Sequence, residues 1–120
     1  MPERLSPHET HGGKLMRIFL DEGDRHGNQP LYTAIVDALR AAGFTGATVL
    51  KGIEGFGTHK AVHALRSFDF SADLPVVIEV VEDERKILDF LPTLRSMIDE
   101  GLITLENISL VRLSKKGDVT

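Results

Sequence analysis

The order of strand-like and helix-like segments limits the fold of this chain more than any other feature of its sequence. Two segments repeat apolar residues at the 3.6-residue spacing of an amphipathic helix, and four short runs are apolar and mostly rich in β-branched residues. The strand-like runs are 15–20, 47–51, 75–81 and 107–113, and the helices are expected to span about 30–42 and 83–100. The chain therefore has the order β-α-β-β-α-β.

This order is the split βαβ pattern of ferredoxin-like domains, an α+β fold in which two helices cover one face of a four-stranded antiparallel sheet. Proline and glycine mark the helix ends: Pro30 suits the first turn of one helix, and Gly43 and Gly101 are placed to stop the two helices. Pro92 lies inside the second helical pattern, where the lost bond to the Leu88 carbonyl predicts a kink.

Apolar residues occupy both faces of the expected strands. Val76, Ile78 and Val80 take one side of the third strand, while Val77 and Val81 lie on the other. Two helices on one face cannot cover both sides of a sheet, so we expect another subunit to cover the second face.

Composition indicates one soluble domain. The chain has 120 residues, of which 42% are hydrophobic and 27% charged. We expect a folded domain over 14–113, with disordered tails at 1–13 and 114–120. The absence of cysteine excludes disulfides and thiol catalysis, and a net charge of -4 argues against nucleic acid as a partner. No apolar run approaches the roughly 20 residues of a membrane span, so a cytoplasmic protein without membrane insertion is expected.

Two longer stretches carry a family resemblance: "RIFLDEGDRHGNQPLYTAIVDALRAAGFTGATVLKGIEGFGTHKAVH" and "DLPVVIEVVED". They resemble the uncharacterised PII-like family called domain of unknown function 190, over about 15–113. The resemblance implies a ferredoxin-like subunit and a homotrimer whose three sheets face one another. It also implies that 53–73 takes the place of the T-loop, the effector arm of PII signalling proteins, which usually bind adenine nucleotides between subunits near its base.

The motif "KGIEGFG" follows the second expected strand. Gly52, Gly55 and Gly57 permit positive φ and close backbone approach to a ligand, and Lys51 could hold a phosphate. Glu54 would repel phosphate, so it must bind a metal, contact another ligand group or point outward. The alternative is a loop base that needs unusual backbone angles, next to an ordinary surface lysine.

A second candidate patch, "DEGDRHG", joins the first strand to the first helix. Glu22, Asp24 and Arg25 are the side chains in it that we expect to grip a ligand. The alternative is a solvated turn built from residues that turns normally use.

His59 and His63 lie four residues apart, which on a helical turn places both imidazoles on one face. With Glu54 nearby they are candidate metal ligands, although two histidines fall short of the three or four ligands that a site normally needs. A hydrogen-bonding His63 near the subunit interface is the alternative. No nucleophile with a base beside it is evident, so we expect no enzymatic activity.

These observations predict a PII-like regulatory protein that binds a small anionic ligand in clefts between the subunits of a homotrimer. An adenine nucleotide is the first candidate for the ligand, and 53–73 would contact a regulated protein. Two alternatives stay open: a divalent-metal-binding trimer like the CutA proteins, and a small enzyme on the ferredoxin-like fold, which hosts many activities.

Overall fold

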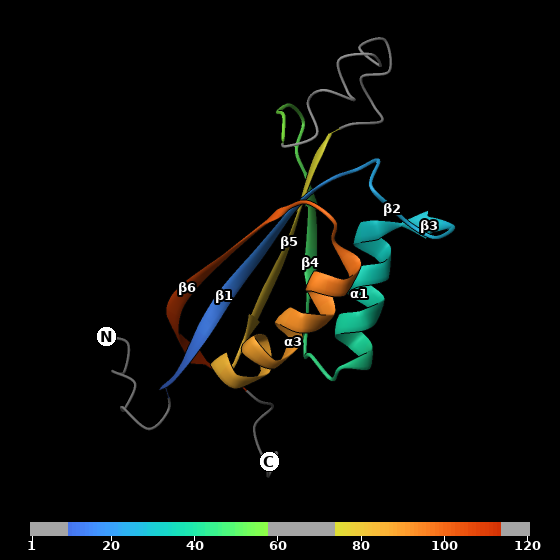
Figure 1. Cartoon of the computed structure of the whole chain (residues 1–120). Helices are drawn as coiled ribbons and strands as arrows, with labels where there is room; N and C mark the ends of the chain where they lie inside the picture. Colours follow the sequence, from blue (N-terminus) through green and yellow to red (C-terminus); the bar gives the residue numbers. More distant parts are fainter. Residues whose placement is uncertain (1–9, 58–73, 114–120) are drawn as a thin grey trace.

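The computed structural model of the chain describes residues 10–57 and 74–113 (Figure 1). Its elements follow the expected order, with a small added hairpin, β2 and β3. They are β1 (Thr10–Asp21), β2 (Arg25–His26), β3 (Gln29–Pro30), α1 (Leu31–Ala41), β4 (Thr48–Lys51), β5 (Pro75–Glu82), α3 (Glu84–Met97) and β6 (Leu102–Val111). None of the described helices is long and apolar enough to span a membrane.

The four longer strands form one antiparallel sheet in the order β4-β5-β1-β6. Both α1 and α3 lie on one face of this sheet (Figure 1). The predicted α+β, ferredoxin-like fold is therefore confirmed. β1 lies between β5 and β6 in this sheet.

The core lies between the sheet and the two helices. Alternate residues of β1 and β5 point into it, which is the period of a strand with one face buried. The helices contribute stripes at helical spacing, and the buried stripe of α3 consists of Ile87, Phe90 and Leu94. The core cluster consists of Met16, Ile18, Leu20, Leu31, Ile35, Leu39, Ile78, Val80, Ile87, Phe90 and Leu94.

The helix ends bear out most of the sequence-based reasoning. Pro30 is the N-cap residue of α1. Gly43 has a φ of 84° and donates its N–H to the Arg40 carbonyl, so it terminates α1 as predicted. The prediction that α3 ends at Gly101 is wrong, because α3 ends at Met97 and Ile98 is already extended. The helix passes through Pro92 to reach that end.

No described helix covers the second face of the sheet. As predicted, Val77 and Val81 lie on this face, opposite in direction to the buried Val76, Ile78 and Val80. Phe19 on β1 and Leu102 on β6 share the face and are partners in the strand register. We call this surface the open face.

The open face also carries charges that the sequence analysis did not foresee. Arg17 on β1 binds Glu79 on one side, with 2.9 Å between Nε and Oε2, and Glu106 on the other. These two carboxylates hydrogen-bond the guanidinium and raise the pKa of Arg17. The three residues form a ladder of charge across β5, β1 and β6, set among apolar side chains.

Two strands extend further than predicted. β1 begins at Thr10, so the expectation of a disordered tail over 1–13 is wrong for residues 10–13. Gly13 pairs with Ile108, and a Cβ on Gly13 would lie only 2.6 Å from Leu110 Cδ1, so this glycine serves close strand packing. Correspondingly, β6 begins at Leu102 and not at the predicted residue 107, and it ends at Val111.

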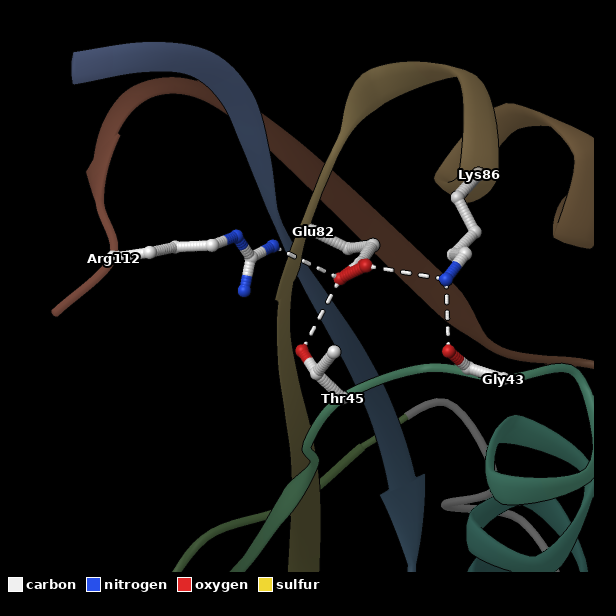
Figure 2. Close-up of polar contacts among 5 residues, drawn as sticks. All are labelled: Gly43, Thr45, Glu82, Lys86 and Arg112. Carbon is white, nitrogen blue, oxygen red and sulfur yellow. Dashed lines mark hydrogen bonds and ion pairs between the residues drawn. The ribbon is translucent and has the colours of Figure 1, made fainter. Parts of the chain in front are cut away.

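A buried carboxylate ties four elements together at the end of β5 (Figure 2). Glu82 accepts a hydrogen bond from the Thr45 hydroxyl (3.3 Å) and pairs with Arg112 (3.3 Å) and Lys86 (3.4 Å). Lys86 also donates to the Gly43 carbonyl (2.8 Å). Buried charges are tolerated when they are paired in this way, so the cluster anchors the connection between α1 and β4 to α3 and to the end of β6.

Candidate functional site at the loop base

Residues 52–57 follow β4 (Figure 1), and Gly52 and Gly55 pack against Pro75, the first residue of β5. The Gly52 N–H donates to the Pro75 carbonyl (2.7 Å). A Cβ on Gly52 would lie 2.8 Å from Pro75 Cγ, and one on Gly55, whose φ is 151°, would lie 3.0 Å from the same atom. Close approach to Pro75 therefore explains both glycines without a ligand, as the alternative interpretation of the motif holds.

Gly57 lies beside the buried end of β1. A Cβ at this position would lie 3.1 Å from Asp21 Oδ1, so a side chain here would crowd the carboxylate. Asp21 is only 5% exposed. Its backbone N–H donates to Asp24 Oδ2 (3.0 Å), and the Asp24 carbonyl accepts from the Leu31 N–H (2.8 Å). Asp24 thus stabilises the connection between β1 and α1. This contact agrees with the alternative interpretation of the patch, in which its residues build a turn.

Lys51 and Glu22, two of the predicted ligand-binding residues, form an ion pair. The Lys51 side chain is 52% exposed, whereas that of Glu22 is 20% exposed. The hydrogen bond to Glu22, followed by the attraction between the two charges, raises the pKa of Lys51. The other oxygen, Glu22 Oε1, is buried and has no hydrogen-bond partner among residues 10–57 and 74–113.

The structure does not bring the remaining predicted residues close to the Lys51–Glu22 pair. Arg25 lies on the exposed β2–β3 hairpin, which projects from the domain near the start of α1 (Figure 1), and its Nη2 donates to the Asn28 carbonyl (2.6 Å). Glu54 is exposed. His59 and His63 lie outside the described residues. Within the described ranges, no group of three or more His, Cys, Asp or Glu residues is arranged to hold a metal ion.

A cavity of about 180 Å³ lies between the loop base and the open face. Aromatic rings from β1 and the glycine-rich segment form part of its wall, and Leu102 closes it from β6. Among the lining residues that the structure describes, Asp21 is the one with a carboxylate. The lining residues are Phe19, Leu20, Asp21, Phe56, Gly57, Pro75, Val76 and Leu102.

Most of these lining residues were not predicted from the sequence as site residues. Phe56 is an aromatic residue inside the predicted glycine-rich motif, and that sequence signal could have been used; in the structure its side chain is 88% exposed. Phe19 and Leu102 meet only because β1 and β6 pair in one register. Asp21 is one residue away from the predicted Glu22.

The arrangement suits a ligand with a flat apolar part and polar groups at one end. The aromatic and aliphatic walls offer area for stacking and burial, and Asp21 accepts hydrogen bonds. Lys51 lies outside the lining: its register partner on β5 is the buried Val76, so the lysine side chain leaves β4 on the helix side of the sheet. Such a mainly apolar pocket with a few convergent polar groups is typical of small-molecule sites.

Solved structures of other proteins share this fold. A protein of Thermus thermophilus assigned to PII-like signalling has a TM-score of 0.59 and 20% sequence identity, with 85% of this chain and 92% of that chain covered. The protein CPII of Thiomonas intermedia K12, solved with ADP, AMP and acetate, has a TM-score of 0.53 and 20% identity, with 86% and 92% covered. These likenesses define the architecture as PII-like.

The chain belongs to the DUF190 family, described as "Uncharacterized ACR, COG1993", whose model matches residues 13–110. A UPF0166 protein of Aquifex aeolicus is 35% identical over 100 residues, which cover 83% of this chain and 94% of that protein. A UPF0166 protein of Methanocaldococcus jannaschii is 40% identical over 93 residues, covering 77% and 85%. The predicted family is therefore confirmed.

Proposed function

We propose that this protein is a PII-like regulatory protein that binds an adenine nucleotide at the loop base and presents 53–73 to a partner protein. The observation that carries the proposal is the cavity between the glycine-rich segment and the open face. Its aromatic walls can stack on a nucleotide base, and Lys51, which lies outside the lining at the same end of the sheet, would attract an anionic group that extends beyond the cavity.

We also propose that the site is completed by a second copy of the chain. Phe19 and Leu102 belong both to the cavity and to the open face, so a subunit packed on that face would border the ligand. Apolar residues on both faces of the sheet favour such packing, and a homotrimer with the three sheets facing one another is the assembly we propose.

The fold neighbours support an adenine nucleotide as the ligand. CPII was solved with ADP and AMP, together with acetate in one structure and bicarbonate in another. Lys51 is engaged with Glu22, but an ammonium has three N–H donors and half of this side chain is exposed, so it can hold a phosphate and Glu22 together.

The test is calorimetry of the wild type with AMP, ADP, ATP and cyclic AMP, each with and without magnesium. We expect at least one nucleotide to bind with a Kd below millimolar and to raise Tm, because a ligand of the folded state stabilises it. Lys51→Ala should weaken that binding several-fold, whereas Arg40→Ala, on the exposed surface of α1, should not. No binding of any nucleotide at millimolar concentration would overturn the proposal.

A further inference from the structure

The sheet ends in two edge strands, β4 and β6, and no strand of the described ranges pairs with the outer side of either one. All four residues of β4 are exposed, and they include the apolar Val49 and Leu50. On β6, Leu102 is 56% exposed. An edge strand offers unpaired backbone N–H and C=O groups to another chain, and exposed apolar side chains beside those groups favour such pairing.

The two edge strands run in opposite directions. β1 is antiparallel to both β5 and β6, and β4 is antiparallel to β5, so β4 runs in the direction of β1 and β6 runs against it. In a ring of three copies whose open faces point inward, each sheet turns its β4 edge toward the β6 edge of the next copy. Rotation about an axis along the strands preserves their direction. The two edges therefore meet as an antiparallel pair, which is the pairing that joins all neighbours within the sheet.

The rows of side chains that cross the open face have matching residues at the two edges. One row consists of Leu50, Val77, Phe19 and Leu102, and the next row consists of Thr48, Glu79, Arg17 and Thr104. If each row continues into the next copy, leucine lies beside leucine and threonine lies beside threonine. The leucine pair buries apolar area, and paired threonines stabilise neighbouring strands.

We propose that β4 of one copy pairs antiparallel with β6 of the next, in the register that sets Leu50 beside Leu102 and Thr48 beside Thr104. This inference rests on the proposed three-fold assembly and adds the strands and residues that join its subunits. Leu102 also lines the cavity at the loop base, whereas Leu50 is outside the described lining of its own copy's cavity. Leu50 therefore extends the cavity wall of the neighbouring copy, and the ligand site borders two chains.

Disulfide cross-linking tests this pairing directly, because the chain has no cysteine of its own. In Thr48→Cys/Thr104→Cys, β5 and β1 separate the two positions within one copy, so their Cα atoms lie about 14 Å apart. A disulfide needs a Cα separation of about 4.4–6.8 Å, so the bond can form only between copies. We expect oxidation to give covalent dimers and trimers on a non-reducing denaturing gel, which a reductant returns to single chains.

Three variants serve as controls. Thr48→Cys/Leu105→Cys moves the second thiol by one residue to the other face of β6, so it should not cross-link. Thr48→Cys and Thr104→Cys alone should not cross-link either, because unlike edges meet in the proposed ring. Cross-linking of either single variant would overturn the inference, since like edges would then meet about a two-fold axis. Equal cross-linking of the Leu105 variant would also overturn it, because collision and not register would then determine the reaction.

A second pair keeps the test independent of the folding of the threonine variants. Leu50 and Leu102 are 48% and 56% exposed, so Leu50→Cys/Leu102→Cys should fold, and we expect it to give the same covalent trimers. If neither pair cross-links while light scattering gives the mass of three chains, β4 and β6 do not join the subunits, and the proposed trimer stands without this pairing. A wild-type mass of a single chain would instead contradict the proposed assembly and the pairing together.

Discussion

The Lys51 ammonium pairs with the Glu22 carboxylate and thereby joins the edge strand β4 to the connection that follows the central strand β1. β5 lies between these two strands in the sheet, so the contact bridges across it at the loop base. The Glu22 side chain is largely buried, and Lys51 supplies the opposite charge that makes its burial tolerable. A lysine that we propose as a phosphate ligand therefore has a structural partner as well.

The pH dependence of stability tests this pair. Its hydrogen bond raises the pKa of Lys51 above the usual 10.5. A group whose pKa rises on folding stabilises the protein fully below its unfolded-state pKa and loses this contribution as the pH passes through the folded-state value. Lys51→Met should thus lower Tm by a constant amount from about pH 7 to pH 9, and by less above the usual lysine pKa.

The control for this measurement is Arg40→Met, because a guanidinium does not titrate in this range. Its effect on Tm should stay constant throughout. A difference between wild type and Lys51→Met that already changes between pH 7 and pH 9 would show that another group controls the pair.

The open face predicts different outcomes for two neighbouring residues of β5. Val77 lies on the open face, whereas Ile78 is fully buried under the helices. Val77→Asp should separate the subunits and leave a folded monomer, and Ile78→Asp should unfold the chain, because an unpaired charge is costly in either environment. Light scattering with circular dichroism distinguishes the two. A wild-type mass of 13.2 kDa, that of a single chain, would refute the assembly.

The Glu82 cluster predicts a loss of stability when its charge is removed. Glu82→Gln keeps an acceptor for Thr45 but gives up the ionic contacts to Lys86 and Arg112, so the free energy of unfolding should fall by about 1–3 kcal/mol. Glu84→Gln, which removes an exposed carboxylate from its pair with the largely buried Lys14, should cost about 1 kcal/mol or less. Urea denaturation of both variants at one protein concentration decides this; equal effects would mean that Glu82 is not an anchor.

The fold could be predicted largely because its signals are local. Helical and strand periods, and the stop at Gly43, lie within single segments of the chain. The strand ends could not be predicted, because pairing sets them. Gly12 and Gly13 were assigned to a disordered tail from the sequence, yet they continue β1 because β6 pairs with them, and there is no room for a Cβ at Gly13.

The candidate site was predicted only in part for the same reason. Two of the predicted residues, Lys51 and Glu22, form an ion pair, and the motif glycines pack against Pro75 and Asp21. The cavity itself depends on Phe19, Leu102 and Pro75, which come from three different strands and meet only in the folded sheet. No local sequence pattern marks these three residues as lining residues. Phe56 differs from them, because an aromatic residue within a glycine-rich segment can be recognised from the sequence.

The central claim is a nucleotide site at the loop base that neighbouring subunits complete. Calorimetry of AMP with the wild type and with folded, monomeric Val77→Asp tests it most directly, since Val77 is outside the cavity lining. We predict one AMP bound per chain in the wild type, and at least tenfold weaker binding to the monomer. Binding of AMP to the monomer with wild-type affinity, or no binding to the wild type, would contradict the claim.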